Sequence, residues 1–331
     1  MRRQLSNLSA QRGAAILTAM LTVVLVATLA ASTLWQQWRN VEIETAQRAR
    51  TQATWVLSGA LDWARLILRE DARRGGADHL AEPWAVPLES ARLSTFLAAD
   101  RSDALEADEM QQAFLSGQIT DLQARLNVVN LVESGKVHEP SRLALARLFE
   151  LLNLPDSELT ALLENLRQAQ GLSTEGVGNA TAAPSGNAPL WPQSVDQLAW
   201  LGLSASTLER LRPFIAVLPV RTPVNLNTAP AEVLYACVEA FSLADARRLV
   251  SERSAKHLTS INEAAQTSGQ NNAQFNPAQH SVASRFFEVR GTLRMEQTVV
   301  QELSVVQRDG LSVSVLARQR SVERAKVASL Q

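Results

Sequence analysis

The sequence predicts an α+β protein: a long N-terminal helix, half of it in a membrane, packs on a small antiparallel sheet, and an all-α domain is inserted. Three observations predict this fold. Residues 14–34 form an uncharged apolar run, residues 139–280 carry mostly helical patterns, and the chain from Ser284 onward alternates between apolar and polar residues. The length of 331 residues allows about two domains.

The first element is the apolar segment AAILTAMLTVVLVATLAASTL from Ala14 to Leu34, which has no charge, proline or glycine. At ~1.5 Å rise per residue this helix is ~31 Å long and matches a ~30 Å hydrocarbon core. A secretory signal peptide is the alternative, but its apolar region is usually only ~7 to 15 residues long. Trp35 and Trp38 follow the run, where an interfacial aromatic belt forms. We therefore predict one transmembrane helix at residues 14–34.

Charges before the apolar segment predict its orientation. Arg2, Arg3 and Arg12 precede it, and residues 1–13 contain no acid. The positive-inside rule then keeps the N-terminus in the cytoplasm and sends the rest of the chain across the membrane. The whole chain has 32 basic and 33 acidic residues. This balance lacks the broad basic field of a protein that binds nucleic acid by neutralising phosphates.

The helical pattern continues beyond the membrane segment. Apolar residues recur at steps of four and three, which predicts one buried helix face: Ala49, Ala53, Val56, Ala60, Trp63 and Ile67. No strong helix breaker occurs before Gly75 and Gly76, so we predict one helix over residues 14–69. A helix with one apolar stripe requires a sheet to cover that stripe.

The residues before the apolar segment carry the first resemblance. Gln11 to Leu17 read QRGAAIL, and a short basic leader ending in glycine before a long apolar helix resembles the cleavage site of type IV prepilins and pseudopilins. The resemblance implies that a prepilin peptidase cuts after Gly13 and methylates the new amino terminus at Ala14.

Residue 18 indicates which group of pseudopilins this chain resembles. Most members of these families have a glutamate at the fifth mature position, where it meets the amino terminus of a neighbouring subunit, and this chain has Thr18. The type II secretion system protein K family, minor pseudopilins at the filament tip, lacks that glutamate. Thr18 is therefore a candidate assembly residue. Its hydroxyl can also bond the Ala14 carbonyl within the helix.

Two internal motifs are also similar to the protein K family. The first matches at Ile119, Asp121, Arg125, Asn127, Asn130, Leu131 and Val132. We interpret it as a strand whose asparagines tie down a turn through side-chain to backbone hydrogen bonds. The second matches at Asn225, Asn227, Thr228 and Glu232. Here Thr228 is the expected N-cap of a helix with Pro230 in its first turn. The resemblance implies that this helix belongs to an inserted SAM-like domain.

A leucine-rich block at 140–170 and the capping-box spacing of Ser194 and Gln197 predict helices, and residues 171–192 predict a loop.

The insert also bears on metal binding. The family's acidic calcium-binding run corresponds to about residues 162–178, which contain only Glu164 and Glu175 as carboxylates. Calcium takes about six to eight oxygen ligands. We therefore predict no cofactor, and the missing acids argue against the calcium known in the family.

The N-x-N-T-A element also occurs in helix-hairpin-helix proteins that bind DNA during competence. Those proteins present backbone amides to phosphate from a G-x-G hairpin. Residues 235–253 contain no glycine pair, and acids interleave with Arg247, Arg248 and Arg253. A membrane-anchored DNA-binding protein of this type is the first alternative function, although we predict no nucleic-acid partner.

An enzyme is the second alternative. His79, His138, His257 and His280 stand apart in sequence, and the chain lacks a metalloprotease, nucleophile-elbow, P-loop or dinucleotide motif. The acidic residues between Asp100 and Glu109 are expected to form a solvated face, and Cys237 a small core residue. We predict no enzyme, with a periplasmic hydrolase of unrecognised site kept as the alternative.

The C-terminal part predicts the sheet that covers the first helix. Alternating residues occupy Phe287 to Met295, Val299 to Val306 and Leu311 to Val315, with Asp309-Gly310 as a hairpin turn. Residues 318–331 are polar and are expected to fray.

The sequence predicts the following division of the chain into segments. A prepilin leader occupies residues 1–13, a transmembrane helix 14–34, a pilin-like domain 35–138 and 281–331, and an all-α insert 139–280. The resemblance implies a type II secretion minor pseudopilin in the bacterial inner membrane, single-pass, with its soluble part periplasmic. Implied partners are other minor pseudopilins at the tip, the major pseudopilin, the prepilin peptidase and the inner-membrane assembly platform.

Overall fold

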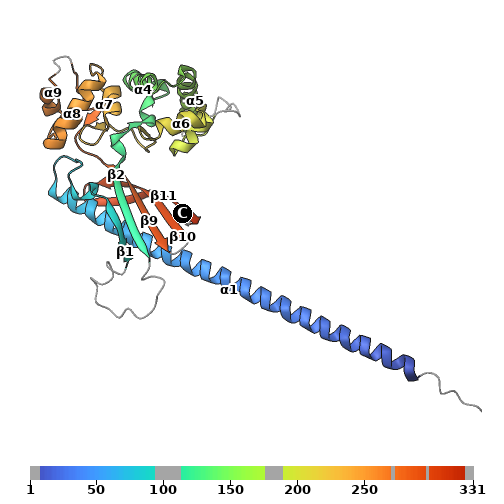
Figure 1. Ribbon diagram of the computed structural model, residues 1–331. Helices are drawn as coiled ribbons and strands as arrows, with labels where there is room; N and C mark the ends of the chain where they lie inside the picture. The colour runs from blue at the N-terminus through green and yellow to red at the C-terminus, as the bar shows by residue number, and fades with distance from the viewer. Residues whose placement is uncertain (1–7, 94–112, 176–188, 270–272, 296–297, 325–331) are drawn as a thin grey trace, which may run out of the picture. The chain divides into compact units, whose positions relative to one another are not determined.

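The computed structural model describes residues 8–93, 113–175, 189–269, 273–295 and 298–324 (Figure 1). The predicted acidic run between Asp100 and Glu109 lies outside these residues. The chain separates into two compact units, residues up to Val56 and residues from Leu57 onward. The second unit contains the sheet and the inserted helices.

Helix α1 runs from Leu8 to Arg74 and includes the predicted membrane segment. Its part from residue 14 onward is long and apolar enough, by length and composition, to cross a membrane. The helix ends where Gly75 and Gly76 take φ values of +68° and +116°, conformations that cost glycine little. The predicted breaker is therefore confirmed, and the helix extends five residues beyond the predicted end.

The buried stripe of α1 in the second unit consists of Leu57, Leu61, Ala64 and Leu68. These residues join a core with Trp84 and with apolar side chains of the sheet. The predicted stripe was wrong at Trp63, which is 62% exposed, whereas Ile67 of that stripe is partly buried and packs against this core. Both sets have steps of three and four, because the helix is apolar around much of its circumference. Spacing alone therefore does not select the buried face.

Replacing Leu68 tests this assignment. We expect Leu68→Ala to lower the free energy of unfolding by at least about 2 kcal/mol, because Leu68 is fully buried and its removal leaves a cavity. Trp63→Ala removes a larger but exposed side chain and is expected to change stability by less than about 0.5 kcal/mol. Urea unfolding of the full chain in detergent measures both. An equal loss in the two variants would contradict the observed stripe.

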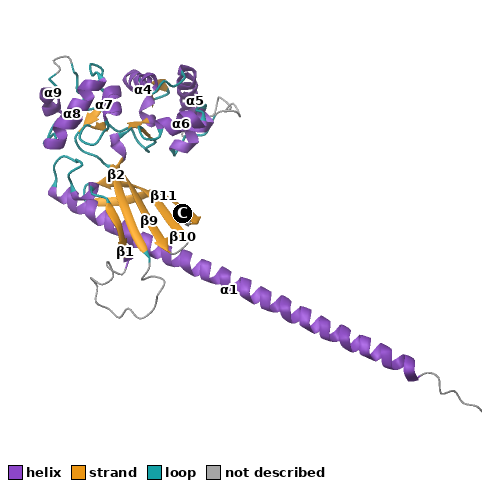
Figure 2. Ribbon diagram, in the orientation of Figure 1, coloured by secondary structure: helices purple, strands orange, loops and turns teal. Residues whose placement is uncertain are grey.

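Five antiparallel strands form the sheet in the order β1-β2-β9-β10-β11 (Figure 2). Their bounds are Leu88–Arg92, Phe114–Asp121, Phe286–Met295, Thr298–Asp309 and Ser312–Arg324. Strands β2 and β9 are neighbours although the entire helical insert lies between them in sequence. A Cβ atom on Gly291 of β9 would lie 3.0 Å from a methyl group of Leu57, so this glycine allows α1 to approach the sheet closely.

The hairpin of β10 and β11 turns at Asp309-Gly310 as predicted, with Asp309 paired to Ser312 and Gly310 at φ +56°. The predicted fraying was wrong for residues 318–324, because β11 continues to Arg324, and residues 325–331 lie outside the described part of the chain. Arg318 and Arg320 form ion pairs with Glu302 of β10, whose side chain is only 3% exposed. A buried carboxylate requires a partner, and these polar residues supply it.

The predicted helical insert is confirmed between β2 and β9. Its α-helices have these bounds: α4 Glu139–Leu151, α5 Asp156–Glu175, α6 Ala205–Leu211, α7 Ala231–Cys237, α8 Leu243–Ala255 and α9 Ile261–Thr267. One core joins α4, α5 and α6 with the 3₁₀ helix η4 (Val195–Leu201), and a second joins α7, α8 and α9. Three pairs of two-residue strands accompany these helices. They are β3 (Leu126–Asn127) with β6 (Ile215–Ala216), β4 (Val132–Glu133) with β5 (Lys136–Val137), and β7 (Val224–Asn225) with β8 (His280–Ser281).

Two local predictions in the insert were wrong. The loop expected from Gly171 was wrong for residues 171–175, which belong to α5, and residues 176–188 of the expected loop lie outside the described residues. The capping box expected at Ser194 does not form, since that side chain makes no cap bond. The Gln197 side-chain oxygen instead accepts from the backbone N–H of Gln193, one residue earlier. The element that follows is a 3₁₀ helix, whose tighter turn alters which groups face each other.

Candidate functional site

The two internal motifs meet at a buried polar junction between the sheet and the insert. Asp121, the last residue of β2, accepts four hydrogen bonds. Its Oδ1 accepts from the backbone N–H of Gln123 at 2.7 Å. Its Oδ2 accepts from Asn225 Nδ2 at 3.1 Å and from the hydroxyls of Thr228 and Ser284 at 2.6 Å each. One carboxylate thus joins β2, the start of the second helical core and the segment that enters β9.

Two opposing effects act on the pKa of Asp121. Burial raises the pKa of this carboxyl to about 6, and the nearby charge of Asp78 acts in the same direction. The hydrogen bonds from Ser284, Thr228 and Gln123 favour the carboxylate and partly offset the burial. The group is therefore solvated by protein donors instead of water.

Arg308 of β10 forms the second half of the junction. Its guanidinium donates to Asp71 Oδ2 at 2.6 Å, to Asp78 Oδ1, and to the carbonyl of Ser284 at 2.8 Å. Asp78 Oδ2 also accepts from the backbone N–H of Ser284 at 2.6 Å. Burial opposes the charge of Arg308, but Asp78 and Asp71 raise its pKa above the ordinary value. We call Asp78, Asp121, Asn225, Thr228, Ser284 and Arg308 the polar junction.

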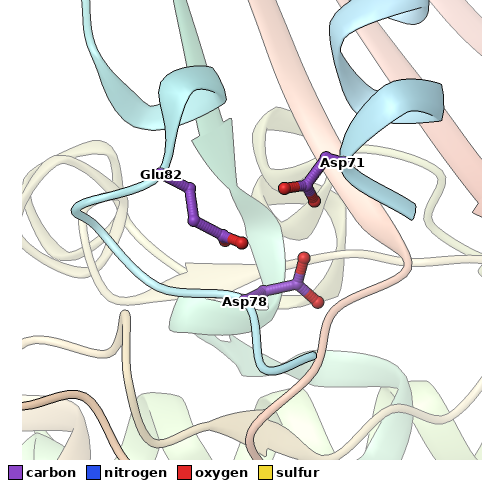
Figure 3. A group of neighbouring side chains, drawn as sticks. All are labelled: Asp71, Asp78 and Glu82. Atoms are coloured by element: carbon purple, nitrogen blue, oxygen red, sulfur yellow. The ribbon is translucent and has the colours of Figure 1, made fainter. Parts of the chain in front are cut away.

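Three carboxylates converge beside Arg308 (Figure 3). Asp71 belongs to the last turn of α1, and Asp78 and Glu82 to the loop after it; their oxygens lie within 4.8 Å of one another. Such a group resembles a cation site in composition. Each acid nevertheless has a protein partner, because Arg308 binds both aspartates and Glu82 accepts from the Trp84 indole and the His79 backbone at 2.8 Å each. We assign no metal to it.

Asn127 and Asn130 hold a distant segment against the first motif. Asn127 Oδ1 accepts from the N–H groups of Val129 and Leu218, and its Nδ2 donates to the Val220 carbonyl at 2.8 Å. Asn130 forms two bonds with the backbone of Thr222, at 2.7 and 3.0 Å. Both asparagines therefore bind backbone groups about 90 positions later in the chain.

The second motif makes contacts both within the second helical core and with the polar junction. Asn225 Oδ1 accepts from the Asn227 N–H at 2.9 Å, and Asn227 exchanges two hydrogen bonds of 2.9 Å with the Leu258 backbone. Glu232 lies in the first turn of α7, where a negative charge is favourable. The N-cap expected at Thr228 was wrong, because α7 has Pro230 as its cap residue. The hydroxyl of Thr228 bonds Asp121 instead.

The residues predicted to serve in processing and assembly lie elsewhere, in the first unit. Gly13, Ala14 and Thr18 are all within α1, which continues through them. The Thr18 hydroxyl donates to the carbonyls of Ala14 and Ala15 at 3.1 and 3.0 Å. These bonds satisfy a hydroxyl that would otherwise be unpaired in an apolar environment.

The described side chains of the stretch that corresponds to the family's calcium run, residues 162–170, offer few ligands for that ion. Glu164 lies on α5, where its carboxylate accepts from Arg167 and Gln168. Among the described side chains of residues 162–178 it is the only carboxylate. A single acid that is already paired on a regular helix does not supply the several oxygens that calcium takes.

The structure also shows what the sequence analysis missed. Asp78, Ser284 and Arg308 were not singled out, because they come from a loop, a strand entry and a strand without a shared motif. His79 and His257 stack with ring centroids 3.8 Å apart, although no spacing links them. Cys237 is half-buried, and burial raises its pKa to about 12, which leaves the thiol unreactive.

Two models of one known protein family match ranges of this chain that coincide with the two helical cores. The sequence models of "Type II secretion system (T2SS), protein K" match residues 124–220 and residues 224–283. The first range contains the core of α4, α5 and α6, and the second contains the core of α7, α8 and α9. Each core thus corresponds to one conserved unit of that family.

Individual proteins are similar over most of the chain. Type II secretion system protein K of Klebsiella pneumoniae is 30% identical over 273 residues, covering 76% of this chain and 78% of its own. That of Pseudomonas aeruginosa is 26% identical over 323 residues, covering 93% and 89%. A chain of the crystal structure of the GspK–GspI–GspJ complex from enterotoxigenic Escherichia coli is similar in fold, with a TM-score of 0.60 and 20% identity. This likeness covers 83% of the present chain and 98% of that one.

Proposed function

This chain belongs to the type II secretion system protein K family of minor pseudopilins, which are structural subunits and not enzymes, and we propose that it caps the tip of the periplasmic pseudopilus. The observation that carries the proposal is the likeness over three quarters of the chain to protein K of Klebsiella pneumoniae. In this role the protein helps start filament assembly for protein export across the outer membrane.

The division of the chain supports this role. The leader at 1–13 stays in the cytoplasm, residues 14–34 cross the inner membrane, and the remainder is periplasmic. The pilin-like part at 35–138 and 281–331 carries α1 and the sheet, and the SAM-like insert at 139–280 extends from it. The first hydrophobic core of the insert also uses Val128, Leu131 and Val132. The segment that enters the insert is therefore part of the insert's first core.

Thr18 supports a terminal position in the filament. A glutamate at this depth is retained in a membrane only where it has a partner, because a buried charge there costs roughly 2.5 to 3.5 kcal/mol. Thr18 satisfies its hydroxyl within its own helix. A subunit with this residue needs no neighbour above it.

Two other minor pseudopilins are the proposed partners at the tip. The similar solved structure is a complex of GspK with GspI and GspJ, and this is the assembly we propose for the present chain. The major pseudopilin, the assembly platform and the prepilin peptidase complete the set of partners.

The helix-hairpin-helix alternative loses its physical support at the predicted basic patch. Arg253 is buried and donates to the carbonyls of Leu226 and Ala229. Arg248 donates to the carbonyl of Ser268. Of the three arginines, only Arg247 is exposed without a protein partner in the described part of the chain. One free cation is too little for phosphate binding.

Intact mass of the membrane-extracted chain tests the proposed processing. We expect the mature protein to begin at methylated Ala14, because a glycine at position 13 leaves room for the peptidase and a side chain there does not. Gly13→Val is expected to retain the leader and to abolish secretion in a complemented deletion strain. Ala10→Val makes a similar change inside the leader and is expected to be processed normally. A wild-type chain that starts at Met1, or one that is cut after Leu34, would contradict the proposed processing.

A further inference from the structure

A cavity of about 240 Å³ opens between the loop after α1 and the second helical core. His79, Leu80 and Ala81 line it from the loop, and Asn227, Arg253 and His257 line it from the core. One water takes about 30 Å³ in the liquid, so the cavity has room for a small ion with part of its hydration. No acidic residue belongs to its described lining.

Arg253 brings a buried positive charge to this cavity. The residue is only 7% exposed, and its guanidinium donates to the carbonyls of Leu226 and Ala229. No carboxylate pairs with it in the described part of the chain. Burial accordingly lowers its pKa to about 10, and the group stays charged at neutral pH. A buried guanidinium normally has an anionic partner, and here the protein does not provide one.

The two histidines add hydrogen-bond donors. Their rings stack in parallel, with centroids 3.8 Å apart and 9° between the planes. The backbone N–H of Ala81 donates to His79 Nδ1 at 3.3 Å, so the proton of the neutral ring lies on Nε2. Among the described residues, neither that Nε2 nor a ring nitrogen of His257 has a hydrogen-bond partner.

Nearby acids do not neutralise this group, because they are already engaged. Asp71 and Asp78 pair with Arg308, and Glu82 accepts from Trp84 and the His79 backbone. Lys256, beside His257, pairs with Glu263. The side-chain amide of Asn227 donates to the Leu258 carbonyl and accepts from the Leu258 N–H, so Asn227 lines the cavity without binding a ligand. The free polar capacity of the cavity therefore consists of donors and positive charge.

We propose that this cavity is a binding site for a small oxyanion, a tetrahedral ion of the sulfate or phosphate type or a carboxylate, held by Arg253, His79 and His257. Such a ligand joins the loop after α1 to the helical insert, and its binding stabilises the second unit. This inference does not depend on pilus assembly and goes beyond the proposed function.

Titration of the full chain in detergent with sodium sulfate and, separately, with sodium acetate tests the proposal, with sodium chloride at matched ionic strength as the reference. The thermal unfolding midpoint and the calorimetric heat are both recorded at neutral pH, where Arg253 is charged. We expect a saturable response to at least one oxyanion above the chloride reference. A stronger response to sulfate assigns the tetrahedral class, and a stronger response to acetate assigns the carboxylate class.

Matched variants locate the response. His257→Phe keeps an aromatic ring to stack on His79 but removes the ring N–H, and it is expected to weaken the apparent affinity about tenfold, the loss of one hydrogen bond. Arg247→Gln removes a charge on the exposed face of the neighbouring helix α8 and is expected to leave the affinity unchanged. Oxyanion responses no larger than those to chloride, or equal affinities in wild type and His257→Phe, overturn the site. Neither result bears on leader cleavage or secretion.

Discussion

Arg308→Met is expected to lower the free energy of unfolding by about 4 kcal/mol. Arg308 compensates two carboxylates, Asp71 and Asp78, whose side chains are only 10% and 5% exposed. Removing one partner of a buried pair leaves an uncompensated charge, which typically costs about 3 to 5 kcal/mol. Methionine keeps much of the side-chain length, so the change acts mainly through the lost charge and hydrogen bonds. Urea unfolding followed by tryptophan fluorescence measures the loss.

A neighbouring arginine supplies the control for this prediction. Arg285 pairs with Asp309, and both side chains are about half exposed. Exposed pairs contribute only about 0 to 1 kcal/mol, so Arg285→Met is expected to have a small effect. Combining Arg308→Met with Asp71→Asn and Asp78→Asn removes the stranded charges and is expected to recover part of the stability. Similar losses in Arg308→Met and Arg285→Met would show that the junction does not carry the proposed energy.

Asp121→Asn is expected to change the pH dependence of stability. Burial raises the pKa of Asp121 to about 6 from 3.8, so the folded protein holds a proton more tightly than the unfolded chain. The stabilisation from this protonation is fully present below about pH 3.8 and is lost as the pH rises through about 6. A shift of this size corresponds to about 3 kcal/mol. Asparagine does not titrate and removes this contribution.

The difference between wild type and variant isolates Asp121 from other titrating groups. Burial also lowers the pKa of His79 and His280, which act in the opposite direction as the pH falls below about 6.5. Their effects are common to both proteins and cancel in the difference. We expect the stability of wild type relative to Asp121→Asn to fall by about 3 kcal/mol between about pH 4 and pH 7.5. A constant difference across this range would contradict the raised pKa.

Local patterns in the sequence were sufficient for the main elements. The apolar run and its continuation predicted α1, the glycine pair predicted its end, and Asp309-Gly310 predicted the hairpin. Each of these signals depends on residues that are close in sequence. The same patterns did not select the buried stripe of α1, because leucines and other apolar residues occupy two overlapping faces with the same spacing.

The motifs located the junction only in part. Asp121, Asn225 and Thr228 stood in the two matched segments, but their mutual contacts were not predictable from either segment alone. Their further partners, Asp78, Ser284 and Arg308, occur in segments without periodicity or motif. The fraying predicted from Arg318 failed for a related reason. The polar residues of β11 are ordered by a buried carboxylate on the adjacent strand.

The sequence by itself determined an apolar N-terminal helix long enough to cross a membrane, a C-terminal sheet, a helical insert and the family to which their motifs belong. Only the tertiary structure decided which side chains form the polar junction and that His79, His257 and Arg253 share a cavity. The physical reason is the distance in sequence over which these interactions act. Helix and strand periodicity arises from neighbouring residues, whereas Asp121 and Ser284 are 163 positions apart and meet because β2 pairs with β9 across the insert.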